Sequence, residues 1–243
     1  MTHKTKGIIL RTVKYGETSL IITAFTELFG IQTYIVNGVR SSKQGSSKGN
    51  YFQPAIILDM VVYHNEQKAI HRIKEYHFAH LYKHISGDVI KNCIALYMVE
   101  LLQKCLKQPE ANPDLFSFCE EALLQLDTAG KTITANFLLF FSLHLPHFFG
   151  FRMNDNYDHS NDFLDLREGN FMDHQPIHPH FITGEKAAII SQLLKVMQPA
   201  ELSELRLNQT TRRELLLHYQ DYYALHIPDF GHIRTLQVLH EVL

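Results

Sequence analysis

The hydrophobic periodicity of this 243-residue chain changes once, and the change divides the chain into two parts. In the first eighty residues, apolar positions alternate with polar ones, as in Thr18 to Thr26, and turn signals such as Gly16-Glu17 and Gly30 separate the runs. From Ser86 onward, apolar residues recur every three or four positions, as in Ile90 to Cys105. Alternation is typical of strands and the longer spacing of amphipathic helices. The sequence therefore predicts an α+β, multi-domain protein.

The first part contains five strand-like segments at short, fairly even spacing. No helical pattern separates them, which favours a small closed barrel, because closure leaves few strand edges unpaired. We expect a five-stranded OB-fold barrel in residues 1–82. Its strands are predicted at Gly7 to Tyr15, Thr18 to Thr26, Ile31 to Val36, Ala55 to Tyr63 and Ala69 to Phe78.

The second part, residues 83–243, is predicted to be an all-helical domain with an irregular insert at 152–182. Helices are expected at Ile90 to Cys105, after Asn112-Pro113, at Thr132 to Phe149, after a Thr183 cap, at Gln209 to His226 and at Gly231 to Leu243. The stretch from Ile133 to Phe151 is the most apolar, but polar residues and Pro146 interrupt it. We interpret it as a buried helix and not as a membrane span, which needs about 20 largely apolar residues.

The insert is rich in aspartate, asparagine and histidine and is expected to form small hairpins. His174, His178 and His180 suggest a metal site or a metal-dependent hydrolase, but no HExxH or CxxC pattern accompanies them. The three cysteines are interpreted as buried thiols of helix interiors, in keeping with a reducing cytoplasm. Nucleotide-binding and nucleophile-elbow motifs are also missing. The favoured interpretation is a non-enzymatic protein without a metal or another cofactor.

The net charge of −2 conceals an asymmetry between the two parts. Before residue 84 there are eleven lysines and arginines against five acidic residues, and after it twelve against twenty. A basic module attached to an acidic one indicates that the first part binds a polyanion. Chance clustering is the alternative.

Basic and aromatic residues of the predicted barrel form the candidate DNA-binding set. Cationic grooves with aromatic platforms are typical of proteins that bind single strands. The possible phosphate contacts are Lys4, Lys6, Arg11, Lys14, Arg40, Lys43, Lys48, Arg72 and Lys74, and the possible stacking residues are Tyr15, Tyr34, Tyr51 and Phe52. The alternative is a solvated face over aromatic core residues. The Ser41 to Asn50 loop either closes over a bound strand or is a flexible connector.

The N-terminal pattern resembles that of RecO, a family of bacterial recombination mediators. The segment that carries the resemblance, Gly7 to Arg40, reads GIILRTVKYGETSLIITAFTELFGIQTYIVNGVR. Phe52-Gln53-Pro54, Phe149-Gly150-Phe151 and the closing RRELLLHYQDYYALHI followed by Ile233 to Leu236 extend it over nearly the whole chain.

The resemblance implies a DNA-repair function in the bacterial cytoplasm, at the nucleoid and away from the membrane. Members bind single- and double-stranded DNA, anneal complementary strands, and help load RecA together with RecR. Some bind the acidic C-terminal tail of the single-stranded-DNA-binding protein on the helical domain. From this resemblance Arg11 and Arg40 are expected to contact DNA, and Arg152, Arg212 and Arg213 are candidates for the tail.

Two departures from the family pattern concern the helical part. Many members carry two CxxC pairs as a zinc module, whereas residues 152–181 contain no cysteine. We therefore expect a degenerate, metal-free counterpart in 152–182, with replacement of the thiolates by histidines as the alternative. The acidic helical part argues against a DNA surface beyond the barrel. A protein-interaction scaffold without DNA binding is the second functional hypothesis.

Overall fold

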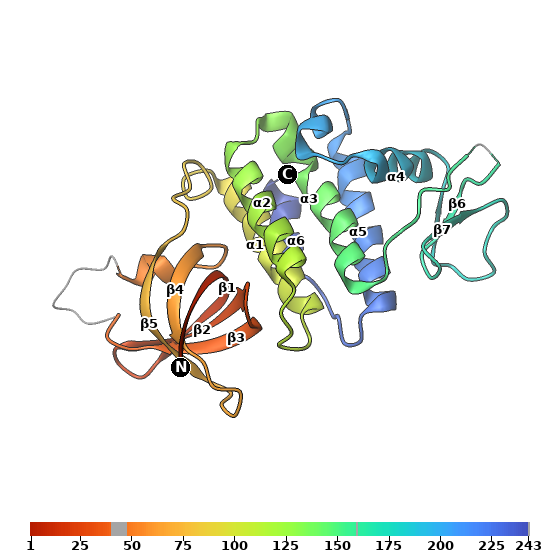
Figure 1. The fold of residues 1–243 in the computed structure, drawn as a ribbon. Coiled ribbons are helices and arrows are strands. Elements are labelled where there is room, and N and C mark those ends of the chain that lie inside the picture. The colour runs from red at the N-terminus through yellow and green to blue at the C-terminus, as the bar shows by residue number, and fades with distance from the viewer. Residues whose placement is uncertain (40–47, 159, 243) are drawn as a thin grey trace. The chain divides into compact units, whose positions relative to one another are not determined.

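The chain forms two compact units in the computed structural model, which describes residues 1–39, 48–158 and 160–242, without the side chains of 48 and 240–242 (Figure 1). The first unit comprises Met1–Lys83 and Leu106–Leu124, and the second comprises His84–Cys105 and Gln125–Leu243. The boundary expected at residues 82 and 83 lies at the end of the first segment. Residues 106–124, expected in the helical domain, are grouped with the barrel.

Five strands close the barrel of the first unit in the order β1-β2-β3-β5-β4. The β3–β5 pair is parallel and the other pairs are antiparallel. This arrangement confirms the predicted five-stranded, OB-like barrel. The strands are β1 (Thr2–Tyr15), β2 (Ser19–Thr26), β3 (Gly30–Val36), β4 (Ile57–Tyr63) and β5 (His71–Phe78).

The long strand β1 closes the barrel because it pairs with two neighbours. Its residues from Thr2 to Ile8 pair with β4, and those from Gly7 to Tyr15 pair with β2. The register of the second ladder shifts between Ile9 and Arg11. Such a bulge bends a strand and increases its twist, so β1 reaches both neighbours.

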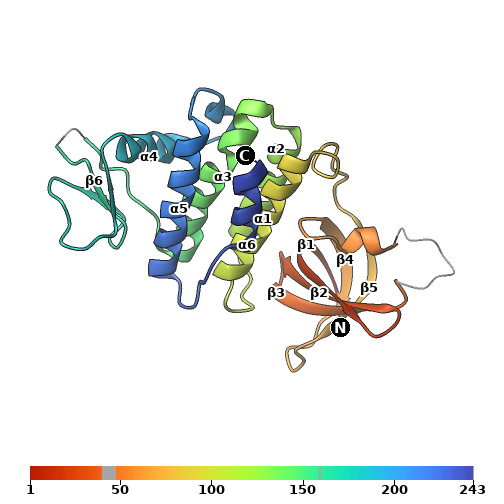
Figure 2. The same cartoon turned by 180° about the vertical axis from the view of Figure 1, so that it is seen from behind.

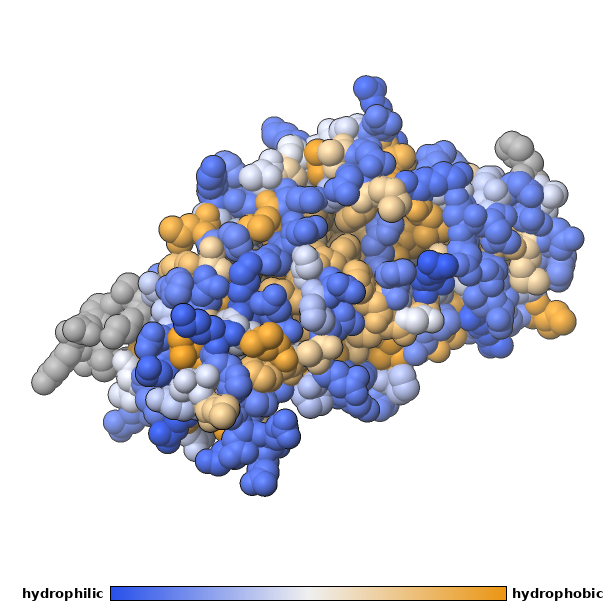
Figure 3. Space-filling view, viewed as in Figure 1, coloured by the Kyte–Doolittle hydropathy of each residue, from blue (hydrophilic) through white to orange (hydrophobic). Residues whose placement is uncertain are grey.

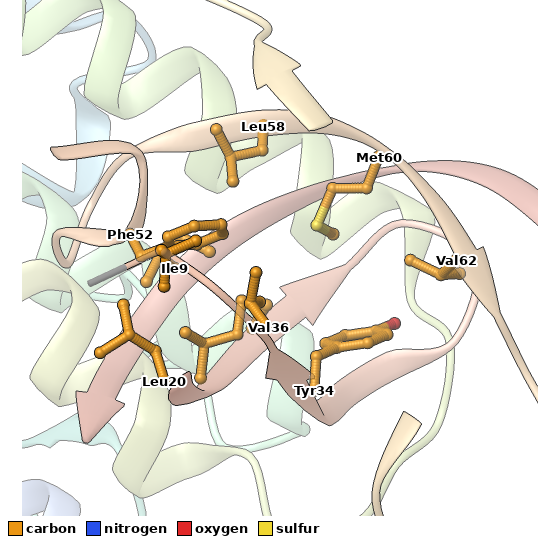
Figure 4. Packing of buried hydrophobic residues seen from close by; sticks show 11 residues of the cluster. Ile9, Leu20, Tyr34, Val36, Phe52, Leu58, Met60 and Val62 are labelled. Atoms are coloured by element: carbon orange, nitrogen blue, oxygen red, sulfur yellow. The ribbon is translucent and has the colours of Figure 1, made fainter. Parts of the chain in front are cut away.

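The barrel core consists of alternate residues from the strands, whose side chains point toward one another (Figure 4). The 3-10 helix η1 (Lys48–Phe52) adds Phe52 to it. Its members include Ile9, Leu20, Ile22, Ala24, Tyr34, Val36, Leu58, Met60 and Val62. Because successive strand residues face opposite sides, the residues between these positions face outward.

Helix α2 (Pro113–Thr128) begins in the first unit. The Asn112 side chain accepts a hydrogen bond from the Leu115 amide at 3.0 Å, as expected of the Asn112-Pro113 start signal. Phe116 on this helix contacts Phe25 of β2, with ring centroids 5.6 Å apart. The segment thus packs on outward-facing apolar residues of the barrel.

The second unit is a helical bundle around α3, and Figure 2 shows α1, α3, α5 and α6 side by side. Glu100 of α1 accepts hydrogen bonds from the amides of Arg234 and Thr235 and so caps α6. Its helices are α1 (Val89–Cys105), the end of α2, α3 (Lys131–His144), α4 (Glu185–Lys195), α5 (Gln209–His226) and α6 (Arg234–Val242), with the 3-10 helices η2 (Leu145–Phe149) and η3 (Pro199–Ser203).

The helix expected at Thr132 to Phe149 is two elements. The α-helix ends at His144, and Leu145–Phe149 is the 3-10 helix η2 with Pro146 in its first turn. Proline lacks an amide proton and its ring clashes with the preceding turn, so the α-helical pattern stops there. Of the described residues, Lys131–Phe149 alone is long and apolar enough to cross a membrane, and most of it is buried inside the protein.

The insert forms a three-stranded sheet of β6 (Phe163–Asp165), β7 (Asn170–Met172) and β8 (Phe181–Thr183) in the order β7-β6-β8. Leu164 and Phe171, which are opposite one another, are buried. The expected Thr183 cap of the next helix is wrong. Gly184 occupies the cap position with φ +66°, a conformation that favours glycine over a capping threonine.

Candidate nucleic-acid interface

Two rows of side chains cross the outside of β1, β2, β3 and β5. Residues opposite one another in a ladder share a face of the sheet, and the residues between these positions fill the core. The rows are Arg11–Thr23–Thr33 and Val13–Ile21–Ile35–Arg72. Together with Tyr15 we call them the outer face. In OB-folds this side and the adjoining loops bind oligonucleotides.

The outer face combines exposed cations with exposed apolar groups. Arg11 and Arg72 are exposed, and in the described part of the chain neither forms an ion pair. Lys14 is also exposed, but it is opposite the core residue Leu20 and so does not belong to the outer face. Val13 is 44% exposed and Tyr15 is 55% exposed. On the barrel, hydrophobic groups lie among hydrophilic ones on the side visible in Figure 3. Such a surface can neutralise phosphates and stack on bases.

Lys6 lies in a different environment from Arg11. Its ammonium is 2.8 Å from Glu120 of α2, whose side chain is 14% exposed, and His80 Nε2 is 3.0 Å from the same oxygen. The hydrogen bond to Glu120 raises the pKa of Lys6. Lys6 therefore joins α2 to the barrel, and its charge is largely compensated.

The stacking role expected of Tyr34 and Phe52 is wrong. Their exposed fractions are 0% and 1%, because both side chains point into the barrel core. Tyr51 stacks on Phe78 with ring centroids 4.0 Å apart. Of the four aromatic residues expected to stack, Tyr15 is the exposed one.

The loop after β3 carries three of the expected DNA contacts. Arg40 and Lys43 lie outside the described residues. Lys48 is the first residue of η1, and only its backbone is described. Val39, the last described residue before the loop, packs into the barrel core.

Two hollows flank the connection between β4 and β5, and sequence reasoning missed both. The first, of about 590 Å³, is lined by Met1, Tyr63, His64, Asn65, Lys68, Ile70, His71 and Arg72. We call it the hairpin hollow. The second, of about 500 Å³, shares His64, Lys68 and His71 with it and is also lined by Pro109. Tyr63 and Arg72 are opposite one another in the β4–β5 ladder, so the hairpin hollow adjoins the outer face.

One of the three arginines expected to bind a partner lines a hollow in the helical unit. Arg212 donates a hydrogen bond to the Leu207 carbonyl and is half-buried, whereas Arg152 is exposed on the strand-rich insert. Arg213 is half-buried on α5. The hollow has a volume of about 500 Å³ and is lined by Lys131, Thr132, Ala135, Asn136, Ser203, Leu205, Arg206, Leu207 and Arg212. We call it the arginine hollow.

The arginine hollow lies where two helices begin, α3 at Lys131 and α5 at Gln209. Helix N-termini carry partial positive charge, which adds to the charges of the three basic residues. Asn136 is 1% exposed; its Nδ2 donates to the carbonyls of Leu202 and Leu205, while its buried Oδ1 has no partner among the described residues. The hollow is suited to an anionic group.

The rings of His178 and His180 are neighbours, with centroids 6.0 Å apart, but among the described residues no hydrogen bond, ion pair or ring contact joins His174 to them, and His174 and His178 contact different aspartates. His174 Nδ1 lies 2.6 Å from Asp173 on the surface, and His178 Nε2 lies 3.2 Å from the buried Asp165. Asp165 also accepts the Arg167 amide and so supports the β6–β7 turn. No group of three or more potential metal ligands is present in the described parts of the chain.

Two family models match the sequence along most of its length. The model described as "Recombination protein O N terminal" matches residues 1–82, and the model described as "Recombination protein O C terminal" matches residues 86–232. The first match covers the strands of the barrel, and the second begins shortly before α1.

Curated relatives are similar over the full length. The chain is 32% identical to a DNA repair protein RecO of Bacteroides fragilis over 243 residues, which are 100% of this chain and 99% of the relative. It is 32% identical to the protein of the same name in Flavobacterium psychrophilum, with the same coverage. For Porphyromonas gingivalis the identity is 28%, with 96% of each chain covered.

Proposed function

Because the chain belongs to the recombination protein O (RecO) family, we propose that it is a recombination mediator in DNA repair. In this proposal it binds single- and double-stranded DNA, anneals complementary strands and assists RecA loading together with RecR. The curated relatives, which are named as DNA repair proteins, support the general process. The residues of the barrel support the mode of binding.

The outer face is the observation that carries the proposal. Arg11 and Arg72 present charges that no described acidic residue pairs, on the same face as the exposed Tyr15 ring, and the exposed Lys14 near the end of β1 is proposed as a further phosphate contact. Phosphates that replace counterions there gain affinity at low salt, and bases gain stacking energy on the tyrosine. Arg40, Lys43 and Lys48 of the following loop are proposed as further phosphate contacts, and Lys6 as a weaker one because Glu120 holds its ammonium.

The partner proposed for the helical unit is the acidic C-terminal tail of the single-stranded-DNA-binding protein. Arg212 is our main candidate, because it lines the arginine hollow with Lys131 and Arg206. Leu205 and Leu207 supply an apolar wall for a side chain of the tail. Arg152 and Arg213 remain secondary candidates.

We assign the protein no catalytic reaction and place it in the bacterial cytoplasm, associated with the nucleoid. Strand annealing needs capture and alignment of two polyanions, which a cationic surface can supply without bond making or breaking. A protein-interaction scaffold without DNA binding is the competing function.

The deciding experiment is fluorescence anisotropy of a labelled single-stranded oligonucleotide, titrated at several salt concentrations. We expect affinity to fall steeply with salt, and the double variant Arg11→Glu/Arg72→Glu to bind at least tenfold more weakly. Loss of two phosphate contacts reduces the slope of log K against log salt by about two. Arg167→Glu, which makes half of this charge change on the exposed part of the insert, is the control and should bind normally.

No binding by the unaltered protein at low salt would reject DNA capture and favour the scaffold. If Arg167→Glu loses half as much binding free energy as Arg11→Glu/Arg72→Glu, net charge, and not the outer face, determines affinity. Annealing of complementary strands with fluorescent labels, measured for the same three proteins, tests the mediator activity.

A further inference from the structure

A stack of aromatic rings at one end of the barrel contains three histidines. The His64 ring lies parallel to Phe29, with centroids 4.0 Å apart, and 4.5 Å from the ring of His71. His3 of β1 meets Phe29 edge-on at 5.3 Å, and Tyr34 lies 5.8 Å from His71. Contacts with Phe29 of the turn between β2 and β3 and with Tyr34 of β3 therefore hold the His64 and His71 rings in place.

The two stacked histidines also line the hairpin hollow. His71 is 4% exposed, and the buried Nδ1 of His64 has no hydrogen-bond partner in the described part of the chain. Lys68 and Arg72 belong to the same wall and are exposed. An anion in this hollow would therefore lie near two exposed cations and beside an imidazole ring that can carry a proton.

The charges around the stack favour neutral rings when the hollow is empty. Burial lowers the pKa of both histidines, a charged His3 lowers the pKa of His64 further, and a charged His64 lowers that of His71. The groups that act on the pair are His3, the terminal amino group and Lys68, which disfavour a proton, and Glu66, which favours one. Tyr34 is buried and neutral because burial raises its pKa.

We propose that the hairpin hollow is a phosphate subsite of the DNA-binding surface, in which His64 of the stack takes up one proton together with the anion. The proposal rests on DNA binding by the barrel and adds a site and a regulation to it. A phosphate near His64 offsets the repulsion from Lys68 and the amino terminus, and an opposite charge nearby favours the charged form of a group. The Phe29 face stabilises the resulting cation.

The linkage has a definite sign. Because the bound state holds the proton more tightly, affinity rises as the pH falls from the bound-state pKa toward the free-state pKa, and it levels off below the latter. For one proton the gain is at most about tenfold per pH unit. Burial and the repulsion from a protonated His64 keep His71, which is 4% exposed, neutral, so the proton is taken up by His64.

The test is oligothymidylate binding by the full-length protein from about pH 8 to about pH 5.5 at constant ionic strength. Thymine does not titrate in this range, so the pH dependence belongs to the protein. We expect the unaltered protein to bind several-fold more tightly at the acidic end. His64→Phe retains a ring between Phe29 and His71 but cannot be protonated, and should lose most of this gain.

Two further variants make the comparison specific. His77→Asn removes a histidine of β5, the strand that contains His71. The His77 side chain is 73% exposed and lies 3.4 Å from Asp59, so this variant should keep the pH dependence of the unaltered protein. Lys68→Gln should weaken binding across the whole range, because it removes a fixed charge of the hollow. Proton uptake, measured by calorimetry in two buffers of different ionisation enthalpy, should be a measurable fraction of one proton near neutral pH and close to zero for His64→Phe.

The outcomes separate the two proposals. Absence of binding at every pH rejects DNA capture itself. Binding with the same pH dependence and proton uptake in the unaltered protein and in His64→Phe rejects the subsite but leaves DNA capture by the outer face intact. If His64→Phe unfolds, which circular dichroism reports, the proton uptake of the unaltered protein decides, and a value near zero rejects the subsite.

Discussion

The Lys6 ammonium and the Glu120 carboxylate join two segments that are far apart in the sequence, and His80 approaches the same carboxylate. Glu120 is mostly buried, so removal of its partner leaves a carboxylate with one remaining contact. The Lys6 side chain is 37% exposed, and solvent weakens its attraction. We therefore expect the Lys6–Glu120 pair to contribute to stability at the upper end of the range for surface ion pairs.

We predict that Lys6→Met lowers the free energy of unfolding by about 1 kcal/mol. Because the pKa of Lys6 is raised in the folded state, the contribution is present at neutral pH and is lost as the pH rises through that pKa. Urea unfolding at neutral pH measures the loss. Lys4→Met, a change at an exposed position of the same strand, is the control and should have no comparable effect. Equal stability of the two variants would contradict the structural role of Lys6.

At the scale of elements, the turn between β2 and β3 depends on a glycine. Gly30 has φ +63°, and a Cβ atom there would lie 2.1 Å from the Glu110 carbonyl oxygen. Gly16, in the turn between β1 and β2, has φ +57° and open space around it. The two positions share a backbone conformation and differ in the close approach of residue 110.

Gly30→Ala should therefore destabilise the protein more than Gly16→Ala. The left-handed conformation costs an alanine about 1 kcal/mol at either site, and the clash with backbone at Gly30 adds about 1–3 kcal/mol. Thermal unfolding of both variants measures the difference. Equal melting temperatures would show that residues 106–112 do not press on this turn.

The strands and helices could be predicted because periodicity reports which face of an element is buried. The side on which an aromatic residue lies is harder to infer, and Tyr34 and Phe52 show why. The register of β3 places Tyr34 inside the barrel, and the 3-10 helix η1 places Phe52 there. The outer face could be predicted from the sequence only in part, since Arg11 and Arg72 come to lie on one face through pairing between strands that are distant in sequence. The ring stack of Phe29, His64 and His71 has the same origin.

At the scale of the whole molecule, the proposed DNA surface and the proposed tail site lie on different units. The outer face belongs to the barrel, and the arginine hollow consists of residues from α3, η3 and α5 with their connection. No residue is shared between them. Binding of one ligand therefore need not displace the other.

We predict that an acidic peptide with a free C-terminal carboxylate and a single-stranded oligonucleotide bind at the same time. Anisotropy with labels of two colours should show additive binding. Arg212→Glu and Arg206→Glu should each weaken the peptide at least tenfold, because they place a negative charge in the hollow, and leave the oligonucleotide affinity within twofold. Arg167→Glu is the control. Mutual displacement of the two ligands would show that they share a surface.

The division of the chain into interleaved segments has a consequence for how the protein is made. The barrel unit includes Leu106–Leu124, and in the sequence α1 of the other unit comes between the five strands and that segment. During synthesis the five strands leave the ribosome first, but Phe116 and Glu120, which cover and anchor them, emerge only after all of α1. The barrel unit is therefore complete only after residue 124 has been synthesised. A gene fragment that ends at residue 82 encodes the strands without these two contacts. A single crossover between genes cannot exchange the complete unit without also exchanging α1 of the other unit.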